Sequence, residues 1–368
     1  MTRRTLYLVL ISTIVLAMAL SACAAPTATP APAAQPAATE APAAVAPTEA
    51  PAASEPAAGP LTFVLVPKNL GNPYFDTADA GAQEAAKELG VTVLYQGPAS
   101  ADATQQIQLI NSLIAQNVNG LAVAADDSDA LVPTGKDAMA AGIPVVSWDS
   151  AIAPDGRVLH INQAVLHDIG AIQIQMASDL AGPDGGQIAI LSATSTAPNQ
   201  NAWIDVMKEV LTQPEYANLE LVDVVYGDDD DTKSYNEAQA LFKKYPDLKV
   251  IIAPTTVGIA ASARAVTDEN LIGKVAVTGL GTPNQMREYV KNGASPQFAL
   301  WNPADLGYLS IQILNALANG TIKGVPGDTF TAGRLGEYTV EEDPDLGVNV
   351  LLGLPFIYNA DNIDDFNW

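Results

Sequence analysis

Short apolar segments alternate with amphipathic stretches along the chain from residue 61 onward. In the amphipathic stretches apolar positions recur every three or four residues, as at Ile107, Ile110, Leu113 and Ile114. This spacing is typical of helices, whereas short continuous apolar runs are typical of strands buried on both faces. The first half of this pattern predicts strands at 61–67, 91–95, 121–124 and 143–148, with helices at 77–89, 101–116 and 129–141.

A second set of the same kind follows a predicted connecting helix at 166–180. It predicts strands at 187–191, 219–225, 250–253, 275–278 and 298–301, helices at 200–211, 232–245, 257–267 and 283–291, then a helix at 306–318 and a β-rich tail. Strands that alternate with helices favour parallel sheets. We therefore predict an α/β protein with two doubly wound, Rossmann-like domains, in which ligands bind beyond the carboxyl ends of the strands.

The first 23 residues have the layout of an export signal. Arg3 and Arg4 precede an apolar run from residue 6 to residue 20, and Leu20-Ser21-Ala22-Cys23 closes it with the only cysteine of the chain. This ending resembles the bacterial lipoprotein box, in which the cysteine thiol is lipidated and becomes the new N-terminus. We predict a lipoprotein signal peptide at 1–23 with a lipid anchor at Cys23; the alternative is an ordinary signal in which Cys23 is incidental.

Residues 24–60 have the composition of a tether. They contain nine prolines and many alanines, with no basic residue. Such a segment buries too little apolar surface to offset its chain entropy, so we predict a disordered leash. The net charge of −24 argues against nucleic acid as a partner, because phosphate binding requires a basic surface.

Polar and aromatic residues follow the predicted strands of the first half. Lys68, Asn72, Tyr74 and Phe75 come directly after the first strand, and Asp149 follows the fourth. Aromatic faces pack on the C–H patches of sugars, while carboxylate, amide and ammonium groups bind their hydroxyls. Strand alternation directs Asp149 toward the cleft and its neighbour Trp148 away from it.

The second half offers a comparable set of strand-end residues. Its candidates are Asn199, Gln200 and Trp203 at a helix start, Pro254 and Thr256 after the third strand, and Trp301 at the end of the last strand. The amides can cap a helix or face a ligand, and each tryptophan can belong either to the core or to a ligand platform.

We recognise no sequence motif for catalysis, for cofactor binding or for metal binding. The run Asp228–Asp231 lacks the spacing of a calcium loop and precedes a helix, which indicates a solvated turn. His160 and His167, the only histidines, lie in no catalytic or metal motif. An exported enzyme would need an acid–base pair in the cleft, where Asp149 is the one carboxylate that we place. We expect a binding protein without a metal or a cofactor.

In order along residues 61–368, several segments resemble type I solute-binding proteins of ABC importers, above all the rhamnose-binding branch and its sister branch of autoinducer-2-binding proteins. The segments are VPKNLGNPYFD from Val66, VVSWDS from Val145, ATSTAPNQNAW from Ala193, VYGDDDDTKSY from Val225, IIAPTTVGIAA from Ile251, VTGLGTPNQM from Val277 and FALWNPADLGY from Phe298. The resemblance implies a clamshell that closes on a sugar and delivers it to an ABC permease and its ATPase, and a monomer.

The resemblance also implies lobe boundaries and specificity. Three crossovers are expected, near 160–162, near Trp301 and in the tail, giving an N-terminal lobe of 61–161 with 302–330 and a C-terminal lobe of 162–301 with 331–368. The autoinducer-2 pattern assigns contacts to Lys68, Asp149, Gln200 and Pro254, but has an aspartate at the position of Asn199 and an alanine at that of Thr256. These departures favour a rhamnose-like deoxyhexose, with an autoinducer-2 binding or sensing protein as the alternative. The ribose-type pattern has an aspartate at the position of Leu280, so ribose is not expected.

Overall fold

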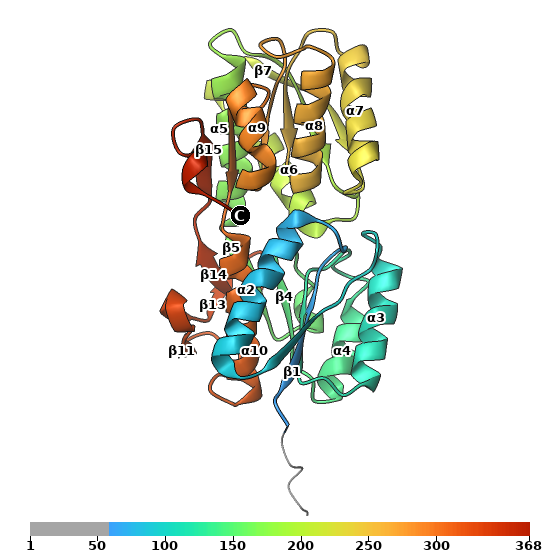
Figure 1. Cartoon of the computed structure of the whole chain (residues 1–368), viewed down its shortest axis with the longest axis vertical. Coiled ribbons are helices and arrows are strands. Elements are labelled where there is room, and N and C mark those ends of the chain that lie inside the picture. The colour runs from blue at the N-terminus through green and yellow to red at the C-terminus, as the bar shows by residue number, and fades with distance from the viewer. Residues whose placement is uncertain (1–58) are drawn as a thin grey trace, which may run out of the picture. The chain divides into compact units, whose positions relative to one another are not determined.

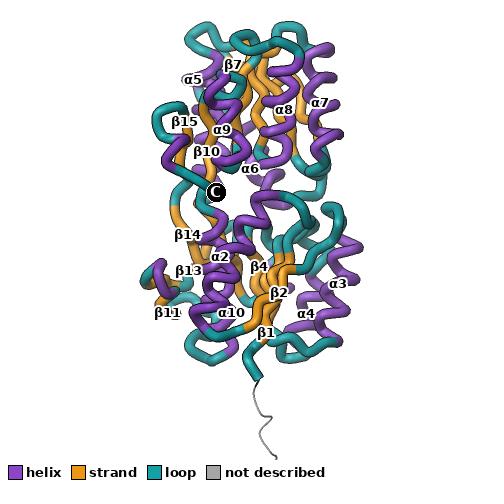
Figure 2. Tube along the Cα trace, viewed as in Figure 1, coloured by secondary structure: helices purple, strands orange, loops and turns teal. Residues whose placement is uncertain are grey.

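The computed structural model describes residues 59–368, which form two main sheets flanked by helices and two small two-stranded sheets (Figures 1 and 2). The predicted lipobox around Cys23, and the predicted tether up to residue 58, lie outside the described residues. The strands are β1 (Thr62–Val66), β2 (Thr92–Tyr95), β3 (Gly120–Val123), β4 (Val145–Trp148), β5 (Leu159–Ala164), β6 (Gly186–Ser192), β7 (Leu219–Tyr226), β8 (Leu248–Ala253), β9 (Ala276–Gly279), β10 (Gln297–Leu300), β11 (Thr329–Thr331), β12 (Glu337–Thr339), β13 (Glu341–Asp343), β14 (Gly347–Gly353) and β15 (Phe356–Asn359). The α-helices are α2 (Pro73–Leu89), α3 (Ala103–Ala115), α4 (Val132–Ala140), α5 (Leu166–Ala181), α6 (Pro198–Val210), α7 (Asp231–Lys244), α8 (Thr256–Asp268), α9 (Pro283–Asn292) and α10 (Pro303–Ala318).

The N lobe is built on a seven-stranded sheet with the order β13-β14-β5-β4-β3-β1-β2, parallel except for β13. Alternate residues of a strand point to opposite faces. Phe63 and Leu65 of β1 therefore join the core beneath α2 and α10, whereas Val64 and Val66 join the separate core that includes Ile110 of α3. Both faces are buried, which explains why the sequence of β1 is continuously apolar.

The C lobe is built on the parallel sheet β7-β6-β8-β9. An isolated parallel bridge between Leu280 and Ala299 adds β10 beside β9, and β15 pairs with β10 in the antiparallel direction. Helices α5 to α9 belong to this lobe (Figure 1). The predicted α/β class with two parallel sheets is confirmed.

The chain passes between the lobes three times: after β5, after β10 and after β14. Two expectations need correction. The first passage begins after Ala164 rather than near residues 160–162, because His160, Ile161 and Asn162 pair in β5 with β14. The tail does not belong wholly to the C lobe either, since β14 pairs in parallel with β5 at an edge that would otherwise be open. Only the tail beyond β14 reaches the C lobe.

Helices α2 and α10 pack unusually closely through two glycines. A Cβ at Gly81 would lie 1.8 Å from the carbonyl oxygen of Ala304, and one at Gly307 would lie 1.9 Å from that of Ala78. Both positions therefore require glycine. This contact fixes the N-terminus of α2, which carries Tyr74, relative to the N-terminus of α10, which follows Trp301.

Candidate ligand-binding site

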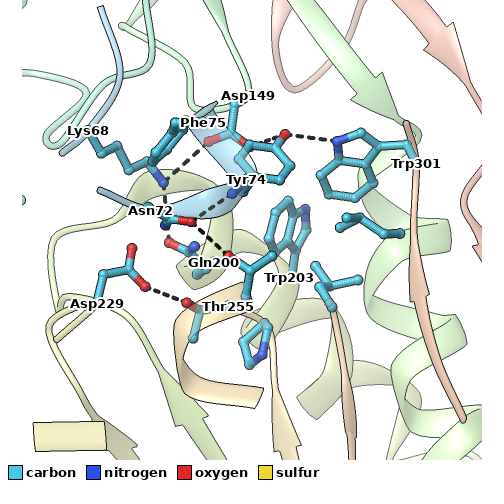
Figure 3. Close-up of a pocket in the computed structure, with 14 residues that line it drawn as sticks. Lys68, Asn72, Tyr74, Phe75, Asp149, Gln200, Trp203, Asp229, Thr255 and Trp301 are labelled. Carbon is cyan, nitrogen blue, oxygen red and sulfur yellow. Dashed lines mark hydrogen bonds and ion pairs between the residues drawn. The ribbon is translucent and has the colours of Figure 1, made fainter. Parts of the chain in front are cut away.

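A cavity of about 30 Å³ lies where the carboxyl ends of the strands of both lobes meet (Figure 3). We call it the ligand cavity. Its lining residues are Lys68, Asn72, Tyr74, Phe75, Asp149, Gln200, Trp203, Asp229, Pro254, Thr255, Thr256, Leu280, Leu300 and Trp301. The structure thus gathers every candidate binding residue from the sequence around this cavity except Asn199, which lies directly behind it.

Lys68 joins the two lobes through the residues at the start of α6. Its Nζ donates to Asn199 Oδ1 at 2.8 Å and to Gln200 Oε1 at 3.4 Å, and lies 3.5 Å from Asp149 Oδ2. All four side chains are buried. A buried ammonium must have such partners, because removing an unpaired charge from water is very costly. Lys68 therefore favours the closed arrangement of the lobes.

Asp149 follows β4 with a left-handed backbone (φ +58°), a conformation that aspartate tolerates better than most residues. Its Oδ1 accepts a hydrogen bond from Tyr74 Oη at 3.0 Å, and its Oδ2 accepts a longer one, 3.3 Å, from Asn199 Nδ2. Burial raises the pKa of Asp149, while the positive charge of Lys68 opposes that rise. The neighbouring Trp148, the last residue of β4, is instead fully buried in the core.

Aromatic side chains form a continuous wall on the other side of the cavity. Trp301 Nε1 donates to Tyr74 Oη at 2.8 Å, and the rings of Trp203 and Trp301 lie 5.9 Å apart, edge to face. Phe75 packs edge to face on Trp148. Both tryptophans predicted as core or platform residues are buried and line the cavity as well.

Asn72 has two contacts that explain its position. It caps the N-terminus of α2, where its Oδ1 accepts from Tyr74 N at 3.0 Å. The same oxygen accepts from Thr256 Oγ1 at 3.1 Å, across the lobe boundary. The polar contacts between the lobes thus involve Asn72 and Thr256 as well as Lys68 and Asn199.

Two carboxylates near the cavity were not among the sequence candidates. Asp229 departs from the expected solvated turn, because it lines the cavity and accepts a hydrogen bond from Thr255 Oγ1. Asp126, directly beyond β3, is 2% exposed, and its carboxyl oxygens have no hydrogen-bond partner among residues 59–368. Burial raises the pKa of Asp126 to about 8, with Lys68 opposing and Asp229 adding to the rise. The strand-end rule that selected Asp149 would also have selected Asp126.

The polar groups of the cavity satisfy one another in this closed arrangement. The chain of hydrogen bonds runs from Trp301 through Tyr74 to Asp149, and Lys68 continues it to Asn199. A cavity of about 30 Å³ has room for only two or three waters at ~10–15 Å³ each. A sugar-sized ligand can enter only if the lobes separate and its hydroxyls replace these contacts.

Within residues 59–368, no group of three or more His, Cys, Asp and Glu side chains is placed to hold a metal ion. Over the same residues, no helix is both long and apolar enough to cross a membrane.

Comparison with known proteins decides the family. Residues 63–322 match the model of the periplasmic binding protein domain. The chain belongs to this family. Among its relatives, the D-allose-binding periplasmic protein of Escherichia coli K12 is 27% identical over 259 residues, which cover 68% of this chain and 83% of the relative. The D-ribose/D-allose-binding protein of Pseudomonas aeruginosa is 27% identical over 239 residues, or 62% and 73% of the two chains.

Several solved structures are similar to this periplasmic binding protein. A solute-binding protein from Clostridium phytofermentas with bound L-rhamnose is 39% identical, with a TM-score of 0.81 over 84% of this chain and 98% of the other. A sugar ABC transporter protein from Actinomyces odontolyticus is 45% identical, with a TM-score of 0.66 and the same coverage. LsrB from Clostridium saccharobutylicum, in complex with AI-2, shares the fold at 24% identity (TM-score 0.79, covering 84% and 100%). The expected family is confirmed, as is the expectation of a binding protein rather than an enzyme.

Proposed function

We propose that this protein captures a rhamnose-like deoxyhexose outside the cytoplasm and delivers it to an ABC importer. Ligand binding is coupled to closure of the two lobes, and docking of the closed form on the permease precedes release. In this scheme the ATPase of the importer supplies the energy for transport, and the binding protein acts as a monomer.

The observation that carries this proposal is the network of polar contacts between the lobes. Lys68 and Asp149 belong to the N lobe, whereas Asn199, Gln200 and Thr256 belong to the C lobe. A ligand that replaces these contacts must touch both lobes at once. Such a ligand stabilises the closed form by the difference between its affinities for the closed and the open form.

Deoxyhexose specificity is supported by the balance of aromatic and polar groups. The tyrosine and tryptophan wall suits the C–H faces and methyl group of a deoxy sugar, while Lys68 and Asp149 suit adjacent hydroxyls. The relative from Clostridium phytofermentas, solved with L-rhamnose, adds support from sequence.

Export and attachment to the membrane are proposed from the sequence alone. Export through the leader and lipidation at Cys23 would hold the protein close to its permease. The Pro/Ala-rich tether would leave the lobes free to open and close. Stable anchoring requires more than one acyl chain, which a lipidated N-terminal cysteine provides.

Autoinducer-2 is a second candidate ligand. Lys68, Asp149, Gln200 and Pro254, to which the resemblance assigns autoinducer-2 contacts, all line the ligand cavity. Asn199 in place of an aspartate argues against this ligand. Under this reading the protein serves signal uptake or sensing.

Titration calorimetry of residues 59–368 tests the proposal with L-rhamnose, D-ribose and autoinducer-2. We expect binding of L-rhamnose, with D-ribose at least tenfold weaker. Tight binding of autoinducer-2 alone would establish the second candidate. The absence of heat with every monosaccharide would contradict a sugar-binding role.

A further inference from the structure

A second and larger cavity lies directly behind the ligand cavity, on the side of the crossover strands. Its volume is about 160 Å³, against 30 Å³ for the ligand cavity. We call it the hinge cavity. Residues of β5 line it together with the N-terminal part of α6, so both lobes contribute to it.

The two cavities share a wall. Asp149 and Trp203 line both of them, and Asn199 lines the hinge cavity while it binds Lys68 at the edge of the ligand cavity. Two long contacts hold this wall together, from Asn199 Nδ2 to Asp149 Oδ2 at 3.3 Å and to Asp149 O at 3.4 Å. Hydrogen bonds of this length are weak. A ligand that binds Asp149 therefore displaces Asn199 from it at the cost of only two weak hydrogen bonds, and this displacement connects the two cavities.

The charges around the hinge cavity disfavour an anionic occupant, because the carboxylates of Asp149 and Asp345 also line it. Arg157 is the cation in its lining, and its guanidinium already donates to the carbonyl oxygens of Ile152, Leu346 and Val348. Burial, reinforced by the charge of Arg157, lowers the pKa of His160 well below its usual range, so this imidazole is neutral. An anionic group would find no free cation there.

One residue in the lining of the hinge cavity, Gln163, carries a buried polar atom without a partner. Gln163 is 2% exposed, and its Oε1 accepts no hydrogen bond from any residue between 59 and 368. Buried acceptors of this kind are normally satisfied by a protein group or an ordered water molecule. The remaining walls include apolar side chains such as Ile152, Leu166 and Trp203. Apolar walls with a few polar groups are typical of small-molecule sites.

We propose that the hinge cavity accommodates a neutral group O-linked to the sugar, an inference that rests on the sugar site proposed above. The protein then binds glycosides of its deoxyhexose, with the sugar ring in the ligand cavity and a second sugar or an aryl group in the hinge cavity. The size is suitable, because a cavity of about 150 Å³ accepts a benzene ring.

The test is calorimetry with L-rhamnose and with both anomers of phenyl L-rhamnopyranoside. Ala202 lines the hinge cavity from α6, and Ala202→Leu fills part of it with little change in helix propensity. Ala80→Leu, at an exposed position of α2, is the matched control. We expect the wild type and the control to bind one phenyl rhamnoside at least as tightly as rhamnose. Ala202→Leu should bind it at least tenfold more weakly while its rhamnose affinity changes by less than threefold.

The outcomes separate this inference from the proposed function. If the wild type binds rhamnose but neither phenyl rhamnoside, or if Ala202→Leu binds the glycoside as the wild type does, the hinge cavity is not a subsite. If neither rhamnose nor either glycoside binds, the proposed sugar site is contradicted, and the proposed subsite is contradicted as well.

Discussion

The Nζ of Lys68 in the N lobe lies 2.8 Å from Oδ1 of Asn199 in the C lobe, and this is the shortest of the buried hydrogen bonds that join the two halves of the ligand cavity. The same ammonium is 3.5 Å from Asp149 Oδ2. In the closed form the Lys68 ammonium is therefore stabilised by Asn199 and Asp149, whereas water takes over this role when the lobes separate.

Replacing Lys68 by methionine should weaken L-rhamnose binding by at least about 100-fold, because it leaves Asp149 buried without its charged partner in the closed form. Titration calorimetry measures the effect. Lys136→Met removes a lysine from an exposed ion pair with Asp155 and serves as the control, for which we expect unchanged affinity. A Lys68→Met protein that binds within threefold of the wild type would exclude this lysine from the site.

Asp149→Asn should abolish detectable binding while the protein stays folded. Asparagine tolerates the left-handed backbone at this position, so the substitution tests the charge rather than the conformation. Calorimetry reports binding, and circular dichroism during heating reports folding. Asp155→Asn, on the exposed surface, is the matched control. Normal binding by Asp149→Asn would remove Asp149 from the site.

Trp301→Phe and Tyr74→Phe each remove one end of the 2.8 Å hydrogen bond between Nε1 and Oη. Each variant should weaken rhamnose binding about three- to tenfold, because both groups orient the carboxylate of Asp149. Residues that act through one contact are not additive. The double variant should therefore bind nearly as well as the weaker single variant. Fully additive losses would show that the two rings act independently.

Asp126 should make stability depend on pH. Its carboxyl holds a proton up to about pH 8 in the closed protein, whereas in the unfolded chain it ionises near pH ~3.9. Between these values the folded form binds more protons. The contribution of this group to stability therefore falls as pH rises, by at most about 1.4 kcal/mol per pH unit, and the loss is complete above about pH 8.

Asp126→Asn should flatten that dependence and stabilise the protein most at pH 8. Urea unfolding at pH 5, 6.5 and 8 measures the free energy of unfolding of the variant, the wild type and Asp155→Asn. We expect the last two to follow the same curve. If the free energy of unfolding changes with pH equally in the wild type and in Asp126→Asn, then Asp126 does not take up a proton on folding.

Cys23→Ser should release the protein from the cell without changing its affinity for sugar. The expectation follows from the lipobox-like ending of the leader. Fractionation of expressing cells, followed by calorimetry of the released protein, measures both properties. Retention of Cys23→Ser in the membrane fraction would favour an anchor other than a lipidated cysteine.

Local pattern was sufficient to predict most of the helices and strands. The strand-end rule also selected Lys68, Asp149 and Gln200, which lie on different elements yet line one cavity. It worked because the carboxyl ends of parallel strands share one edge of a sheet. Asp126 and Asp229 obey the same rule, but Asp126 is not among the sequence candidates, and the aspartate run around Asp229 is interpreted there as a solvated turn.

The sequence by itself determined the alternation of strands and helices and the set of residues at the strand ends, since each depends on neighbouring residues, and the predicted leader with Cys23 rests on the same kind of local pattern. Only the tertiary structure decided which sheet receives the tail, how Lys68 reaches Asn199 across 131 positions of sequence, and that a second cavity lies behind Asp149. Strand propensity does not specify a partner strand, and the position of a side chain across a cleft depends on how two separately folded lobes pack.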